Sequence, residues 1–291
     1  MSEEQTATPP QAATEAVPDD ADDLRSAHFR RLLGKPSTWV ATMVFVIAAG
    51  IAGASFLSAT IGAIAFVAAL VLSLLIVFAI ADQRSEADFF AVYAGQRGLT
   101  LSGRGPLPPA TPLLRKGDDR YAEHAFAGPL ADGVDGVLAL YTYEDESTDS
   151  EGNRQTNYYR YTVGLVEVPE CAAHVPELYC RRKSGLRSLE KLEDAFRSTE
   201  RVTLESEVLA ERYEIFAGKE QDQVWLRRLF SPTFVVWLGE EAPKKFAFEL
   251  AGGTLCCFVN GHRKSAEDLD VIRAASATVA RRLREETLET S

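Results

Sequence analysis

The longest apolar segment of the chain covers residues 36–81, which are 46 consecutive residues without Asp, Glu, Lys or Arg. A membrane-spanning helix needs about 20 apolar residues, each adding about 1.5 Å, to cross roughly 30 Å of hydrocarbon. A single helix over the whole segment would measure about 69 Å, which tilting cannot absorb. We therefore predict a transmembrane hairpin with spans at about 39–57 and 61–81 and a turn at 58–60.

The residues around the hairpin predict its orientation. A cleaved secretory leader is a poor alternative, because 35 residues that begin acidic precede the apolar segment. Arg25, Arg30, Arg31 and Lys35 precede the first span, whereas the turn is uncharged. The positive-inside rule then places the N-terminus in the cytoplasm, and two spans return the C-terminus to the same side. We expect a cell-membrane protein in contact with the lipid bilayer.

Within the hairpin, Trp39 is predicted to be an interfacial anchor, and Gly50, Gly53 and Gly62 allow close approach of helices. The short turn alone brings the two helices together, so a homo-oligomer through the hairpin is left open as an alternative. No ionisable side chain lies inside the segment, which favours an anchor over a transporter.

Residues 1–35 are predicted to form a disordered acidic tail and a basic juxtamembrane segment. The first 24 residues carry seven acidic side chains and no basic one. Thr6 and Thr8 follow Glu3 and Glu4 and are candidate regulatory phosphorylation sites. An ordinary solvated tail is the alternative interpretation.

Residues 82–118 are predicted to form a helical stem and a Pro-rich connector. The helical pattern continues past the second span and ends near Gly95 to Gly98. Four prolines between positions 106 and 112 then favour an extended, stiff segment. A partner-binding polyproline stretch is the alternative.

From residue 119 the hydrophobic period changes to two, which indicates strands. The runs 137–143 and 158–168 predict an antiparallel pair joined by a long, acidic, solvated loop at 144–156. The pattern predicts an α+β domain with mostly antiparallel strands over residues 119–291. Its further predicted strands are 178–183, 202–204, 212–216, 246–250 and 254–259, and its predicted helices are 189–196, 224–230, 231–238 and one capped by Ser265.

Two groups of motifs resemble a known family. After the two spans come Phe-Phe-Ala-Val-Tyr-Ala-Gly-Gln-Arg-Gly-Leu at 89–99 and Leu-Pro-Pro-Ala-Thr-Pro-Leu-Leu at 107–114. Tyr-Glu-Ile-Phe at 213–216, Trp-Leu-Arg-Arg-Leu-Phe-Ser-Pro at 225–232 and Phe-Glu-Leu-Ala-Gly-Gly-Thr-Leu at 248–255 follow. This arrangement resembles an uncharacterised bacterial family of two-span membrane proteins with a cytoplasmic domain of unknown function. The resemblance spans roughly residues 36–262 and implies no activity and no functional residue.

Charge and cysteine content exclude some classes of function. The formal net charge is −11, and residues 82–291 hold 27 basic and 35 acidic side chains, so we expect no nucleic-acid binding. Four cysteines are too few for a disulfide framework, which fits a reducing compartment.

Candidate catalytic and metal chemistry is sparse. Cys171, His174 and Cys180 are weak zinc candidates, because a structural site needs four ligands and the second pair is missing. Cys256 and Cys257 lie in an apolar strand, which does not suit a nucleophile activated by His262. We expect no cofactor, since Pro106 interrupts the one Gly-x-Gly candidate for a phosphate loop.

Three hypotheses for function remain. We favour a membrane-anchored interaction or scaffold module with an unknown protein partner. An enzyme at the membrane surface would require Cys171, His174, Cys180 or His262 to converge in a pocket. A phosphorylation-controlled regulator would act through Thr6 and Thr8.

Overall fold

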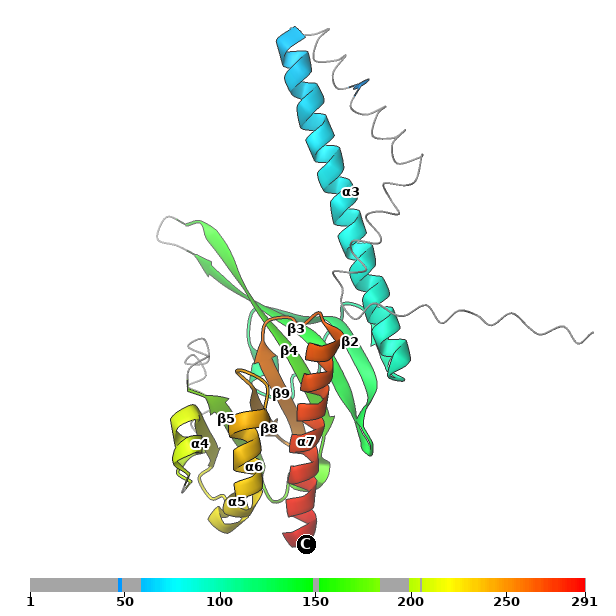
Figure 1. The fold of residues 1–291 in the computed structure, drawn as a ribbon. Coiled ribbons are helices and arrows are strands. Elements are labelled where there is room, and N and C mark those ends of the chain that lie inside the picture. The colour runs from blue at the N-terminus through cyan, green and yellow to red at the C-terminus, as the bar shows by residue number, and fades with distance from the viewer. Residues whose placement is uncertain (1–46, 49–58, 149–151, 184–198, 205, 291) are drawn as a thin grey trace, which may run out of the picture. The chain divides into compact units, whose positions relative to one another are not determined.

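The computed structural model describes residues 47–48, 59–148, 152–183, 199–204 and 206–290 (Figure 1). The chain divides into two compact units, Met1–Val92 and Tyr93–Ser291. The second unit therefore includes the Pro-rich connector as well as the predicted α+β domain.

The described part of the first unit is mainly the helix α3, Ala59–Gln96, which crosses the boundary between the units. The helix joins the predicted second span to the predicted stem without a break. It ends where Gly98 adopts a positive φ of 66° and the Leu99 amide bonds the Ala94 carbonyl at 2.9 Å, as a glycine C-cap does. Ala59 and Thr60 are helical, so their assignment to the turn was wrong.

Several predictions fall on residues outside the described ranges. Of the membrane predictions, these are the anchor Trp39, the glycines Gly50 and Gly53 and nearly all of the first span. The candidate phosphorylation sites Thr6 and Thr8 and the predicted helix 189–196 also lie outside. Gly62 lies in α3. Among the described residues, no helix meets the combined length and hydropathy requirement for a membrane span.

The described residues of the second unit form a nine-stranded antiparallel sheet in the order β1-β2-β3-β4-β9-β8-β5-β7-β6. The predicted α+β class is confirmed at this level. The strands are β1 Thr100–Ser102, β2 Asp119–Ala131, β3 Val134–Thr148, β4 Arg154–Glu167, β5 Glu177–Arg182, β6 Thr199–Val202, β7 Tyr213–Gly218, β8 Ala247–Ala251 and β9 Thr254–Asn260.

The predicted strand pair is β3 and β4, with Tyr141 opposite Tyr161 and Ala139 opposite Val163. The predicted long loop was wrong, because pairing continues to Thr148 opposite Arg154. Polar residues occupy both faces of this two-stranded ribbon, which projects from the rest of the sheet (Figure 1), so its composition resembles that of a loop.

One face of the sheet is covered by α7, Ala266–Thr290 (Figure 1). Its predicted cap is confirmed, since the Ser265 hydroxyl accepts from the Asp268 amide at 3.2 Å. A glycine lets α7 approach β4 closely: a Cβ at Gly164 would lie 2.1 Å from the Ser276 hydroxyl oxygen.

The first turn of α7 is tied to the end of α3 within the second unit. Asp270 accepts from the Tyr93 hydroxyl at 3.0 Å and from Arg97 Nε at 2.7 Å. Burial works to raise the Asp270 pKa, but these donors outweigh it and hold the pKa below its usual value.

The opposite face is covered by the connector segment, residues 107–115, which includes the 3₁₀ turn η1, Leu113–Arg115. Leu113 and Leu114 are completely buried in an apolar cluster that also contains Tyr141, Val163 and Cys256. The connector is therefore part of the core, which the sequence interpretation as a stiff spacer did not foresee.

The remaining helices among the described residues are short. They are η2 Pro169–Cys171, α4 Glu207–Arg212, α5 Gln223–Leu229, α6 Pro232–Val236 and the π-helix η4 Trp237–Glu241. The predicted helix 231–238 is thus an α-helical turn followed by a π-helical one. Pro232 occupies the first helical turn as expected, but the Ser231 side chain makes no capping hydrogen bond.

Candidate functional site

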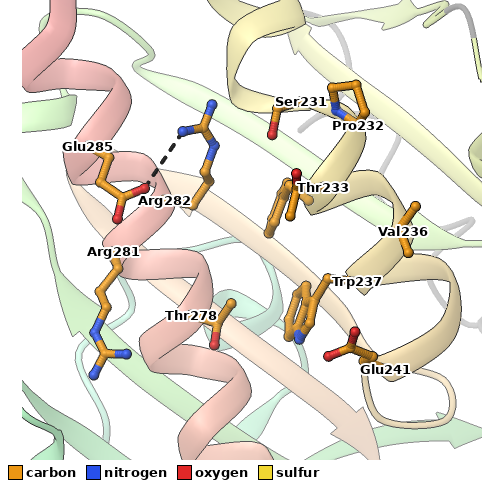
Figure 2. A pocket seen from close by; sticks show the side chains of 11 residues that line it. Ser231, Pro232, Thr233, Val236, Trp237, Glu241, Thr278, Arg281, Arg282 and Glu285 are labelled. Atoms are coloured by element: carbon orange, nitrogen blue, oxygen red, sulfur yellow. Dashed lines mark ion pairs between the residues drawn. The ribbon is translucent and has the colours of Figure 1, made fainter.

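A groove of about 830 Å³ runs between the α6–η4 pair and α7 (Figure 2). The α6–η4 side contributes apolar and aromatic side chains together with the polar Ser231, Thr233 and Glu241, and the α7 side contributes mostly polar and charged ones. The first group includes Pro232, Phe234, Val236 and Trp237, and the second is Thr278, Arg281, Arg282 and Glu285.

The aromatic wall of the groove is held from behind. The rings of Phe234 and Trp237 stack at 5.6 Å with an interplanar angle of 10°, and Trp237 meets Phe246, the residue before β8, edge-on at 5.9 Å. Val236 is 50% exposed beside them. The π turn is closed by the Ala242 amide bonding the Trp237 carbonyl at 2.8 Å. Isolated π turns frequently occur at functional sites.

On the α7 side, Arg282 has a structural role. Its Nε donates to the Leu229 carbonyl at 3.1 Å, and its Nη2 contacts the Arg228 carbonyl and Glu286. These contacts satisfy carbonyls at the C-terminal end of α5, where a cation is also favoured by the helix dipole. Glu285 pairs with the same guanidinium at 3.7 Å.

Arg281 is the arginine available to a ligand. It is exposed, and within the described part of the chain its guanidinium makes one hydrogen bond, to the Asp132 carbonyl at 3.3 Å. A groove lined by an aromatic wall and by such an arginine suits a ligand that carries an apolar group beside a carboxylate. No cysteine or histidine is among the described residues that line the groove.

The structure does not bring the zinc candidates together. Cys171 is buried against α7, where its sulfur accepts from the Thr287 hydroxyl at 3.3 Å. Cys180 is buried in β5, and the backbone carbonyl of His174 accepts from the Gln221 side-chain Nε2 at 2.7 Å. Burial raises the pKa of both thiols. Within the described ranges, no group of three His, Cys, Asp or Glu side chains is placed to hold a metal.

Cys256 and Cys257 lie on opposite faces of β9, and both are fully buried. Burial raises their pKa values, as expected for inert thiols. His262 contacts β3 instead, with Nε2 lying 3.1 Å from the Tyr141 carbonyl and 3.3 Å from the Thr142 hydroxyl. Burial lowers the His262 pKa. The residues required by the enzyme hypothesis therefore do not converge.

The sequence analysis missed one buried acid, Glu249 of β8, which is 4% exposed. Burial raises the pKa of its carboxyl to about 7, and the Leu113 amide donates to Oε1 at 2.7 Å. A signal was present in the sequence, because Glu249 interrupts the apolar run 246–251.

The fold and groove together define an antiparallel sheet domain with a groove in its helical layer. Comparison with protein-family models, with curated proteins and with solved structures found no match to this chain. The resemblance to the bacterial two-span family therefore stays a prediction.

Proposed function

We propose that this chain is a membrane-anchored interaction module. Residues 36–81 hold it in the bilayer, and the groove between α6–η4 and α7 binds a segment of a protein partner. The observation that carries the binding half of the proposal is the aromatic wall of Trp237 and Phe234 in a groove that the exposed Arg281 also lines.

Support for the anchor comes from the 46 uncharged residues and from the surface of α3. Large apolar side chains are exposed around the helix, and exposing them to water is costly, whereas lipid accommodates them without this cost. They are Ile64, Phe66, Val67, Leu70, Val71 and Leu72, each at least 36% exposed.

The partner segment is expected to insert an aliphatic or aromatic side chain against Trp237 and to place a carboxylate on Arg281. A second hollow of about 520 Å³ shares Pro232 and Val236 with the groove. Val236 therefore lies centrally on the proposed contact surface. We infer that binding depends on both the apolar wall and the positive charge.

Site-specific photo-crosslinking in cells tests the binding half. A photoreactive amino acid at Val236 is expected to give a discrete protein adduct, because this position is 50% exposed inside the groove. The same amino acid at Val271 of α7, which is 43% exposed and outside the described groove lining, is the matched control.

Arg281→Glu is expected to reduce the yield of the Val236 adduct about tenfold, because it removes one charge-assisted contact with the partner. Arg201→Glu, at an exposed arginine on β6, is expected to leave the yield unchanged. Equal adducts at Val236 and Val271, or a yield insensitive to Arg281→Glu, would show that the groove is not the docking site.

A further inference from the structure

Glu249 lies in the middle of the sheet on the face covered by the connector segment. Its strand is flanked by β9 and β5, and the register places it opposite Cys256 and Tyr179. A carboxyl at such a position is costly to bury unless it is neutral or hydrogen-bonded.

The polar contacts of the connector segment converge on this carboxyl. The Leu113 amide donates to Glu249 Oε1 at 2.7 Å, and the Leu113 carbonyl accepts from the Tyr141 hydroxyl at 3.3 Å. The Thr111 hydroxyl is also completely buried there, and within the described residues it makes no hydrogen bond of ordinary geometry. It nevertheless favours the ionised form of the Glu249 carboxylate, which lowers the Glu249 pKa.

The surroundings of Glu249 favour its neutral form. Burial raises its pKa from 4.5 to about 7. The Thr111 hydroxyl, the hydrogen bond from the Leu113 amide and the positive charges of Lys116 and Arg115 oppose the rise. The titratable or charged groups that act on it are Lys116 and Arg115 of the connector region, Cys256 of β9, Tyr179 of β5 and Tyr141 of β3.

We propose that Glu249 is a proton-controlled latch that holds the connector segment, residues 107–115, on the sheet. When the segment is docked, the carboxyl is shielded and carries its proton. When the segment lifts, the carboxyl meets water and releases the proton. The docked state is thus the protonated state.

The direction of the pH dependence follows from this linkage. The docked carboxyl has a pKa of about 7 and the solvated one about 4.5, so lifting releases a proton between these pH values. The lifted population should rise about tenfold per pH unit in this window and become constant above it. Acidification therefore closes the latch.

The two adjacent cysteines of β9 report on lifting separately. Cys256 belongs to the apolar cluster beneath Leu113 and Leu114, whereas Cys257 lies on the α7 face, where its thiol contacts Ser276. Lifting of the connector segment should expose Cys256 and leave Cys257 covered. Global unfolding should expose both thiols.

The test uses the full chain in detergent micelles, a pyridyl disulfide reagent and mass-spectrometric assignment of each modified cysteine. The Cys256 modification rate, divided by that of Glu249→Gln at the same pH, is expected to rise about tenfold per pH unit between pH 5 and 7. Division at matched pH removes the intrinsic pH dependence of thiol reactivity. Glutamine keeps an acceptor for the Leu113 amide but cannot ionise.

Glu214→Gln is the matched control, because Glu214 is a half-buried carboxylate on β7, which β5 separates from β8 in the same sheet. It is expected to retain the full pH dependence of the wild-type chain. A second measurement, the ratio of Cys256 to Cys257 modification in the wild-type chain, should show the same rise without any variant. A rate ratio that does not change with pH, or Cys257 rising in parallel with Cys256, would overturn the latch.

Discussion

Deletion of residues 36–81 is expected to transfer the protein almost completely from the membrane fraction to the supernatant. The deleted residues contain no charge and match two hydrocarbon-spanning helices in length. Each inserted span is stabilised by many apolar side chains, so its removal leaves no comparable affinity for lipid. Ultracentrifugation after carbonate extraction measures the distribution, with the intact chain expected to stay in the pellet.

Deletion of residues 1–24 is the matched control, because it removes seven acidic side chains but no part of the apolar segment. This variant should stay in the membrane. Release of the intact chain by carbonate alone would contradict the anchor. A reporter fused after Ser291 tests orientation, and its activity outside the cytoplasm would contradict the predicted topology.

Replacement of Gly136 by alanine is expected to lower the free energy of unfolding by about 3 kcal/mol, at the upper end of overpacking costs. A Cβ at this position would lie 2.3 Å from the Leu165 carbonyl oxygen and 2.7 Å from a Leu130 methyl carbon. The first obstacle is backbone of the paired strand β4, so no side-chain rotation relieves it. Urea denaturation of the detergent-solubilised chain, followed by tryptophan fluorescence, measures the loss.

Gly103→Ala provides the comparison, since nothing lies within 4 Å of a Cβ built at Gly103. Its effect should stay within about 0.5 kcal/mol, as for ordinary surface substitutions. Equal stability of the Gly136 and Gly103 variants would mean that β3 and β4 do not approach as closely as the structure places them.

The regular elements of the domain were predictable where local pattern and tertiary role agree. Period-two alternation gave the β3–β4 pair because one face of each strand packs into the apolar cluster. Gly252 and Gly253, with φ of 58° and 84°, form the predicted hairpin turn between β8 and β9. Ser265 marked the start of α7 because capping is a local interaction.

The candidate site was not predictable in the same way. The groove joins residues 231–241 to residues 278–285, which adjoin because α6–η4 and α7 lie on the same face of the sheet (Figure 1). Hydrophobic spacing alone favoured a continuous helix and did not predict the π turn at Trp237. The cysteine and histidine candidates for metal or catalytic chemistry lie close to one another in the sequence. In the structure all four cysteines are buried, and Cys256 and Cys257 point to opposite faces of β9. The described residues therefore form no group of three that could hold a metal.

By itself the sequence determined the alternation of β3 and β4, the β8–β9 turn and the start of α7, because those features depend on side chains within a few residues of one another. It also carries the prediction of a membrane anchor, which depends on the length of an uncharged segment. Only the tertiary structure decided that the connector is core, that Glu249 meets the Leu113 amide, and that Trp237 and Arg281 line one groove. These contacts join residues far apart along the chain, and burial, which sets their energies, exists only once the sheet and its covering layers have assembled.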